Sequence, residues 1–328
     1  MSIDALLIKC NGRSLFSSTE FSQLQMLYDT EQYEQCRLQC MHSLLNYSYV
    51  EHSDNTIADV VRLMCWSLYR CGLYEEAERY IELASANTIF KPSDPWVEAL
   101  RGWLLVKRGK FRLALENTRS IIKRVKSYGN TDSIAHLLML RGVVQYRLGA
   151  MAYAVDDLTN SISMARITGD TITECHATNS YGLVLMTQGD YAASSRVLKI
   201  ALGKTKQVVQ PRKMVHVLIN LTIVEQKRGA FRESHLCCCE ASKLLDAQAD
   251  QSHRVALRIL ELRGLHYVGE DENARQGALK LLNQHGVECE SRYEPLILEL
   301  LGDIALSETK NESATRYYTR ALSLGRAL

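Results

Sequence analysis

Gly189-Asp-Tyr191-Ala-Ala-Ser194 is the clearest of seven related phrases that recur along the chain. Each phrase has a turn residue, in most copies a large residue two positions later, and then a small residue. The other six are Glu31-Gln-Tyr33-Glu-Gln-Cys36, Gly72-Leu-Tyr74-Glu-Glu-Ala77, Gly109-Lys-Phe111-Arg-Leu-Ala114, Gly149-Ala-Met151-Ala-Tyr-Ala154, Gly229-Ala-Phe231-Arg-Glu-Ser234 and Gly269-Glu-Asp-Glu-Asn-Ala274. Turn positions 109, 149, 189, 229 and 269 follow at steps of 40, and the step from 72 to 109 is 37. A fixed period of this length indicates a solenoid of stacked units that bury their apolar faces on one another.

Between the turns the apolar residues follow helical spacing. Before Gly109 they are Trp96, Ala99, Trp103 and Val106, and after it a second stripe begins at Phe111. Each unit is therefore predicted to be a helical hairpin. We call the helix before the turn helix A and the helix after it helix B. The turn glycine is expected to end helix A in the left-handed conformation.

Proline and glycine positions agree with this division. The four prolines, Pro92, Pro95, Pro211 and Pro295, fall where a helix A is expected to begin. The segments 129–132 and 169–171 supply turn and N-cap residues at equivalent junctions. Gly102, Gly142 and Gly182 recur inside helix A at steps of 40, which predicts close helix crossings there.

With these phrases the chain resembles a tetratricopeptide repeat array, in a longer variant of about 40 residues. The resemblance covers roughly Ser22 to Leu328, and a last unit is readable around Leu301–Ala321. The unit from Gly264 to Leu282 departs from it, with Asp271 where an aromatic residue is expected, so an irregular stack is expected there. The resemblance implies an all-α, right-handed superhelical solenoid of antiparallel hairpins. We divide the single array 1–328 into a lead-in segment, 1–21, and seven to eight hairpins over 22–328.

Composition excludes several classes of function. The chain has 328 residues, 46% of them hydrophobic, and a net charge of +2, which gives no basic face for nucleic acid. No apolar run approaches the ~18 residues of a membrane span. The start, Met1–Lys9, has an early acid and no cleavage site, so it is not a secretory signal. Ten cysteines without such a signal are interpreted as reduced thiols, and the predicted location is the cytoplasm.

The resemblance implies that helix A lines a concave groove. Two features distinguish the residues that the 40-residue register places there: histidines repeat at one position in three units, and aromatic residues gather in the first half. Such residues are enriched at binding hot spots, but tryptophan and histidine also pack between repeats. The candidate binding residues are Asp59, Arg62, Trp66, Tyr69, Trp96, Trp103, His136, Met139, Tyr146, His176, Asn179 and His216.

The same residues argue against a metal site. Packed helices lie about 8–10 Å apart, whereas zinc ligands converge to about 2 Å from the ion, so the histidine row is not expected to share one metal. The run Cys237-Cys238-Cys239 diverges by about 100° per residue around a helix and is interpreted as packing residues with one exposed thiol. Cys36 and Cys40 lack a nearby second pair. No cofactor is predicted.

The functional prediction is a non-catalytic binding scaffold. Long units of this type resemble those in sensory and scaffold regions of bacterial signalling and transcription-regulating proteins, and a self-contained adaptor for a multiprotein complex is the alternative. An enzyme is the third candidate, because no nucleophile elbow, phosphate loop or His-Glu-x-x-His pair occurs. The expected partner is a protein or peptide in the groove, and a small-molecule effector stays open. Tyr318, Leu322 and Leu324 predict an uncovered C-terminal face that pairs with a second copy or with further chain.

Overall fold

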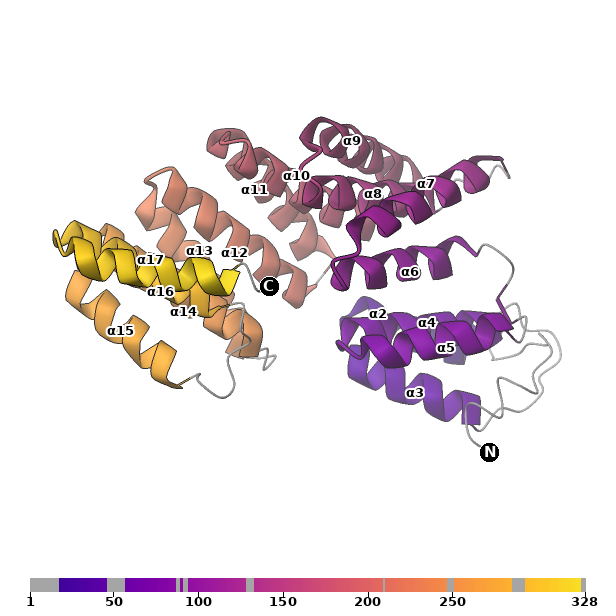
Figure 1. Cartoon of the computed structure of the whole chain (residues 1–328). Helices are drawn as coiled ribbons and strands as arrows, with labels where there is room; N and C mark the ends of the chain where they lie inside the picture. The colour runs from indigo at the N-terminus through magenta and orange to yellow at the C-terminus, as the bar shows by residue number, and fades with distance from the viewer. Residues whose placement is uncertain are drawn as a thin grey trace. The chain divides into compact units, whose positions relative to one another are not determined.

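The computed structural model of the chain describes residues 18–45, 57–86, 89–90, 94–127, 133–208, 210–246, 251–284 and 293–325. Within these ranges the regular elements are all α-helices, which follow one another as antiparallel pairs (Figure 1). None of the described helices is long and apolar enough to cross a membrane. The predicted all-α class of stacked helical hairpins is confirmed.

The chain divides into two compact units, and α10 (Thr171–Thr187) and α11 (Tyr191–Gln207) carry the boundary residues. The first unit comprises Met1–Val184 with Lys204–Gln210, and the second comprises Leu185–Gly203 with Pro211–Leu328. The first contains α2 (Ser18–Asp29), α3 (Tyr33–Leu45), α4 (Ile57–Arg70), α5 (Tyr74–Ala86), α6 (Pro95–Lys107), α7 (Phe111–Ser127), α8 (Ile134–Arg147) and α9 (Met151–Thr168). The second contains α12 (Pro211–Lys227), α13 (Phe231–Asp246), α14 (Gln251–Tyr267), α15 (Asp271–Gln284), α16 (Glu294–Ser307) and α17 (Asn311–Gly325).

The turn phrases join the two helices of each hairpin, as predicted. The glycines at 72, 109, 149, 189, 229 and 269 all have positive φ, from 69° to 85°. The same conformation is taken by Glu31 and Thr309, which occupy the turn position in the first and last hairpins. Glycine adopts this conformation without steric cost, which is why the phrase begins with it in most copies.

In both units, A helices of neighbouring hairpins lie against each other. In the first unit α4 contacts α2 and α6, and α6 contacts α8; in the second, α14 contacts α12 and α16. Among the described residues of either unit, no helix B contacts the helix B of a neighbouring hairpin. The A helices therefore stack on one another along one face of each unit, whereas the described B helices do not.

Proline marks the starts of helix A as predicted. Pro95 and Pro211 are the first residues of α6 and α12, and Pro295 is the second residue of α16. Asp94 caps α6, because its Oδ1 accepts from the backbone N–H groups of Trp96 at 2.9 Å and Val97 at 3.2 Å. Pro92 and the predicted junction 129–132 lie outside the described residues.

Two of the predicted glycines inside helix A, Gly102 and Gly142, sit at close crossings. A Cβ on Gly102 would lie 2.6 Å from a methyl carbon of Leu140. A Cβ on Gly142 would lie 2.8 Å from Leu158 Cγ and 3.3 Å from the carbonyl oxygen of Ala154. Side chains of neighbouring helices therefore fill the space that the glycines leave, which agrees with the predicted tight crossing.

We expect opposite effects from the same substitution at two helical glycines. Gly142→Ala should lower the free energy of unfolding by about 1–3 kcal/mol, because Leu158 Cγ and the Ala154 backbone have little freedom to move away. Gly203→Ala in α11 should raise it by about 1 kcal/mol through helix propensity alone, since nothing lies within 4 Å of its Cβ position. Urea titrations of the two variants measure this, and effects of equal sign would refute the close-crossing interpretation.

The prediction of an irregular backbone around Asp271 is wrong, because α14 and α15 form a regular hairpin. Polar contacts replace the missing aromatic residue: His266 Nδ1 lies 2.6 Å from Asp271 Oδ1, and Ser307 Oγ donates to Asp271 Oδ2 at 2.8 Å. Asp271 stands between the histidine and the serine, so the imidazole contacts the carboxylate and not the hydroxyl. A nucleophilic triad needs the histidine on the serine, so these three residues join hairpins instead.

The last hairpin covers part of the face that the sequence predicts to be open. The ring of Tyr318 packs over Gly302, and its hydroxyl donates to Asp303 at 2.6 Å. Leu322 is 62% exposed. Pairing of this face with a second copy of the chain stays a prediction.

Candidate functional site

All three tryptophans of the chain surround His136 on the helix A side of the first unit. The imidazole of His136, in α8, lies 5.5 Å from the ring of Trp66 in α4, 5.3 Å from Trp96 and 6.4 Å from Trp103, both in α6, measured between ring centres. The elements meet because α4, α6 and α8 are successive A helices in direct contact. We call Trp66, Trp96, Trp103 and His136 the aromatic cluster.

The hydrogen bond from Trp103 to His136 fixes the state of the imidazole. Trp103 Nε1 lies 3.2 Å from His136 Nε2, and an indole nitrogen can only donate. His136 Nε2 is therefore the acceptor, and in the neutral ring the proton is on Nδ1. Burial, aided by the positive charge of Arg70, lowers the pKa of His136 to about 4, so the ring is neutral at pH 7.

Arg70, at the end of α4, brings a positive charge beside this cluster. Its guanidinium carbon lies 5.9–6.0 Å from the ring centres of Tyr33, Trp66 and Tyr69, and its side chain hydrogen-bonds the hydroxyl of Tyr28. Its Nε is buried without a hydrogen-bond partner. Within the described part of the chain no carboxylate forms an ion pair with Arg70, so the charge is compensated only by rings and a hydroxyl.

A second arginine on the same face, Arg62, forms ion pairs with two carboxylates, although its Nε, like that of Arg70, has no hydrogen-bond partner. Arg62 donates to Asp59 at 2.8 Å and to Asp94 at 2.7 Å, which ties α4 to the capped start of α6. Asp59 and Arg62, two of the predicted binding residues, therefore connect two hairpins. Their charges cancel, in contrast to the charge of Arg70.

The remaining predicted residues differ in exposure. Trp66, Tyr69, His136 and Met139 are buried, whereas Trp96, Trp103, Tyr146, His176 and Asn179 are half-buried. His216, in the second unit, is exposed and packs on His253 of α14, with 3.4 Å between His216 Nδ1 and His253 Nε2. The structure thus brings together aromatic residues of α4 and α6 around His136 of α8. The predicted row of histidines does not form one surface, because His136 is buried and His216 is exposed.

Sequence reasoning missed Arg70, Tyr28 and Tyr33. A basic residue in the last turn of a helix is the ordinary complement to the helix dipole, so Arg70 carried no special signal. Tyr28 and Tyr33 flank the first turn, where Glu31 replaces glycine. The usable signal was the density of aromatic residues near the first two turns, Tyr28, Tyr33, Tyr69 and Tyr74.

The cysteines in the described part of the chain show no metal-binding geometry. No group of three or more histidine, cysteine or carboxylate side chains that could hold a metal ion occurs among the described residues. Burial raises the pKa of Cys237 to about 11 and of Cys238 to about 12, so both are thiols at neutral pH. Cys239 Sγ lies 3.5 Å from His235 Nε2 on the surface of α13. Cys36 and Cys40 Sγ are 4.0 Å apart in a buried position.

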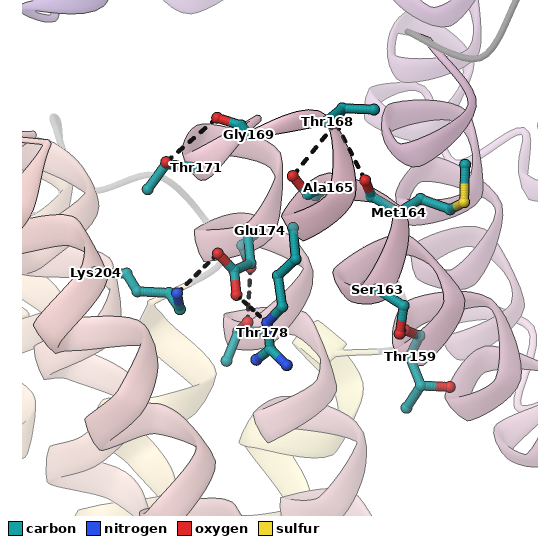
Figure 2. Close-up of polar contacts among 11 residues, drawn as sticks. Thr159, Ser163, Met164, Ala165, Thr168, Gly169, Thr171, Glu174, Thr178 and Lys204 are labelled. Carbon is teal, nitrogen blue, oxygen red and sulfur yellow. Dashed lines mark hydrogen bonds and ion pairs between the residues drawn. The ribbon is translucent and has the colours of Figure 1, made fainter.

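Three of the carboxylates that are buried in the described part of the chain, Glu174, Glu225 and Asp157, are paired with cations. Glu174 of α10 accepts a hydrogen bond from Lys204 Nζ at 2.7 Å (Figure 2). It accepts a second one from Arg166 Nε at 2.5 Å. Burial alone would raise the pKa of Glu174, but these two bonds outweigh it and hold the pKa below its usual range. Glu225 accepts a hydrogen bond from Ser195 and pairs with Arg228 and Lys199. Asp157 accepts hydrogen bonds from Nε and Nη2 of Arg141. The pKa of Glu225 is likewise held below its usual range by these bonds, and all three carboxylates link neighbouring helices.

The fold and this helix A face define a tetratricopeptide-like helical-repeat protein. No protein-family model matches the chain, and no curated protein matches it in sequence. Solved structures do share the fold. Aspartyl phosphate phosphatase F from Bacillus subtilis matches with a TM-score of 0.64 and 13% identity, over 96% of each chain. A Rap protein complexed with Competence and Sporulation Factor matches with 0.61 and 11% identity, over 94% of this chain and 97% of that one.

A tetratricopeptide repeat protein from Parabacteroides merdae ATCC 43184 is also similar, with a TM-score of 0.52 and 19% identity over 82% of this chain and 93% of that one. At these identities the likeness concerns the fold. It confirms the predicted tetratricopeptide-like repeat fold.

Proposed function

We propose that the chain is a non-catalytic scaffold whose first unit binds a polypeptide segment on its helix A face. The observation that carries this proposal is Arg70, a guanidinium beside the aromatic cluster that lacks a carboxylate partner among the described residues. A charge that is partly withdrawn from water gains most from an anionic group placed against it. The ligand is therefore a segment with a carboxylate next to an aromatic or large apolar side chain.

The half-buried Trp96 and Trp103 supply the apolar part of this surface. Tryptophan and arginine are enriched at binding hot spots because they combine a large contact area with a polar anchor. Among the neighbours of the same fold, the Rap protein was solved with Competence and Sporulation Factor bound. That complex supports a binding role for this fold, although it identifies no ligand for this chain.

The biological setting follows the sequence interpretation. We place the scaffold in the cytoplasm, as the sensory or docking region of a signalling or transcription-regulating protein, with a self-contained adaptor as the alternative. The described cysteines are free, including the neighbouring pair Cys36 and Cys40, which fits a reducing compartment. One neighbour is named a phosphatase, but that activity is a property of the neighbour. In this chain the buried carboxylates Glu174, Glu225 and Asp157 are paired with cations, so we assign them a structural role.

Selection of peptides from a random display library tests the proposed site. Peptides enriched on the wild-type chain should carry Asp, Glu or a free C-terminus beside an aromatic residue. Arg70→Met, which keeps the apolar stem among the rings, should weaken the best peptide by about 1.5–3 kcal/mol, the value of a charge-assisted hydrogen bond. Trp103→Ala should weaken it by about 2 kcal/mol or more.

Arg320→Met is the matched control, because it removes an exposed arginine in the second unit and should leave both folding and peptide affinity nearly unchanged. Circular dichroism and urea titration of each variant separate loss of binding from loss of folding. Enriched peptides without an acidic group, or an Arg70→Met variant that binds as well as the wild type, would disprove the proposed anchor. A Trp103→Ala variant that unfolds without any selective loss of binding would mean that Trp103 only packs the repeat.

A further inference from the structure

The seventh hairpin, α14 and α15, exchanges a large and a small residue. Five positions before the turn residue, helix A normally has a buried apolar side chain; the examples are Leu104, Val144, Val184, Val224 and Ile304. In α14 that position is Gly264. Two positions earlier, where α6, α8, α10 and α16 have glycine, α14 has Leu262.

The large residue at 262 is accommodated inside the hairpin, but the side chain missing at 264 is not replaced from a neighbouring hairpin. Leu262 is fully buried, and its Cδ2 occupies the place of a Cβ on Gly277 in α15, at 2.3 Å from that position. The side chain missing at Gly264 is replaced by nothing: around its Cβ position, the nearest atom is Gln226 Nε2 at 3.9 Å. An open space therefore remains where five other hairpins have a valine, leucine or isoleucine.

This space belongs to a pocket of about 610 Å³ between α12, α13 and α14, at the end of the hairpins that carries the turns. Its apolar lining comes from Phe231, Leu260, Leu265 and Val268. Phe231 stacks on Tyr267, with ring centres 5.2 Å apart and planes inclined by 21°. Volume and lining fall in the range of sites for small organic ligands.

The rim of the pocket has one uncompensated positive charge. Arg258 and Glu261 both line it, and they pair with each other at 2.9 Å, so their charges cancel. Arg232, also in the lining, is exposed and makes no ion pair with any described carboxylate. A ligand that fits both parts has a flat apolar body and one anionic group.

We infer that this pocket is a binding site for a small aromatic organic anion. It lies wholly in the second unit and shares no residue with the peptide site proposed above, so either site can fail without the other. The apolar body takes the place of the missing side chain at Gly264, and the anionic group lies against Arg232. Such a ligand is the small-molecule effector that the sequence analysis left open.

Two fluorescent probes of matched shape test the site. The anion 8-anilino-1-naphthalenesulfonate should bind one molecule per chain in this pocket with enhanced fluorescence. Its neutral counterpart, N-phenyl-1-naphthylamine, lacks the sulfonate and should bind more weakly. Gly264→Val restores the residue type of the other hairpins and fills the pocket, so it should weaken the anionic probe by about tenfold or more.

Gly264→Val also provides its own folding control, because its Cβ meets no close contact and valine exceeds glycine in helix propensity. The variant should unfold at the same or a higher urea concentration than the wild type. Arg232→Gln should weaken the anionic probe by about threefold, the value of an exposed ion pair, and leave the neutral probe unaffected. Undiminished binding of the anionic probe to Gly264→Val would overturn the site. Equal affinities of the two probes, with no effect of Arg232→Gln, would overturn the anionic ligand class.

Discussion

Arg141→Met should lower the free energy of unfolding by about 3–5 kcal/mol, the cost of leaving a buried charge without its partner. Arg141 in α8 binds both oxygens of Asp157 in α9 at 2.6 Å, and the aspartate side chain is only 7% exposed. Methionine keeps the apolar stem but removes the guanidinium, so the carboxylate loses its counter-charge in a site with little water. Urea titration at pH 7 measures the loss.

Arg320→Met is the matched control for this prediction. Arg320 pairs with Glu294 across the last hairpin, but their side chains are 60% and 30% exposed, so the loss should stay below about 1 kcal/mol. In the double variant Arg141→Met/Asp157→Leu, most of the stability should return, because the unpaired charge is also gone. Similar losses at Arg141 and Arg320 would show that burial does not govern the strength of these pairs.

Acid should destabilise the wild type through His136. Burial lowers the pKa of His136 to about 4 in the folded chain, below the value near 6.5 of an unfolded histidine. The folded state therefore binds fewer protons than the unfolded state in this interval. The stability contributed by the neutral ring is complete above about pH 6.5 and is lost as pH falls toward 4, by roughly 3 kcal/mol in total.

His136→Phe isolates this contribution. The variant keeps an aromatic ring against Trp66 and Trp96, while the other histidines and the buried carboxylates titrate equally in both proteins. Between pH 7.5 and pH 4, unfolding titrations should show the wild type losing roughly 3 kcal/mol more than the variant. If the unfolding free energies of the two proteins have the same pH dependence, His136 is hydrated in the folded chain and the aromatic cluster does not exclude water from it.

The repeat architecture could be predicted from the sequence because its signals are local. A glycine with positive φ, a proline at a helix start and apolar spacing of 3 to 4 residues each depend on a few neighbouring positions. The 40-residue register then carries these signals from one hairpin to the next. Even the last turn, at Thr309, falls in this register although no glycine marks it.

The candidate site was only partly predictable, because it depends on which residues meet between hairpins. The register placed Trp66, Trp103 and His136 on one face, but it did not distinguish the buried Trp66 from the half-buried Trp103. Arg70 became a candidate anchor only when its surroundings showed rings and a hydroxyl in place of a carboxylate. The pocket beside Gly264 depends on an absent side chain, and its volume follows from the three helices around it.

The close packing of Leu262 against Gly277 limits how repeats of this chain can be recombined. Arrays of equal repeats gain and lose hairpins by crossover between similar segments. A breakpoint within the recurring turn phrase keeps the turn itself intact. At Gly269 such a breakpoint would separate Leu262 from the glycine that accommodates it, and would place the leucine against a residue with a side chain, such as Asp157 or Cys237 in the same register. The seventh hairpin can therefore be duplicated or transferred only as a whole, and chimeric arrays of this chain should be joined between hairpins.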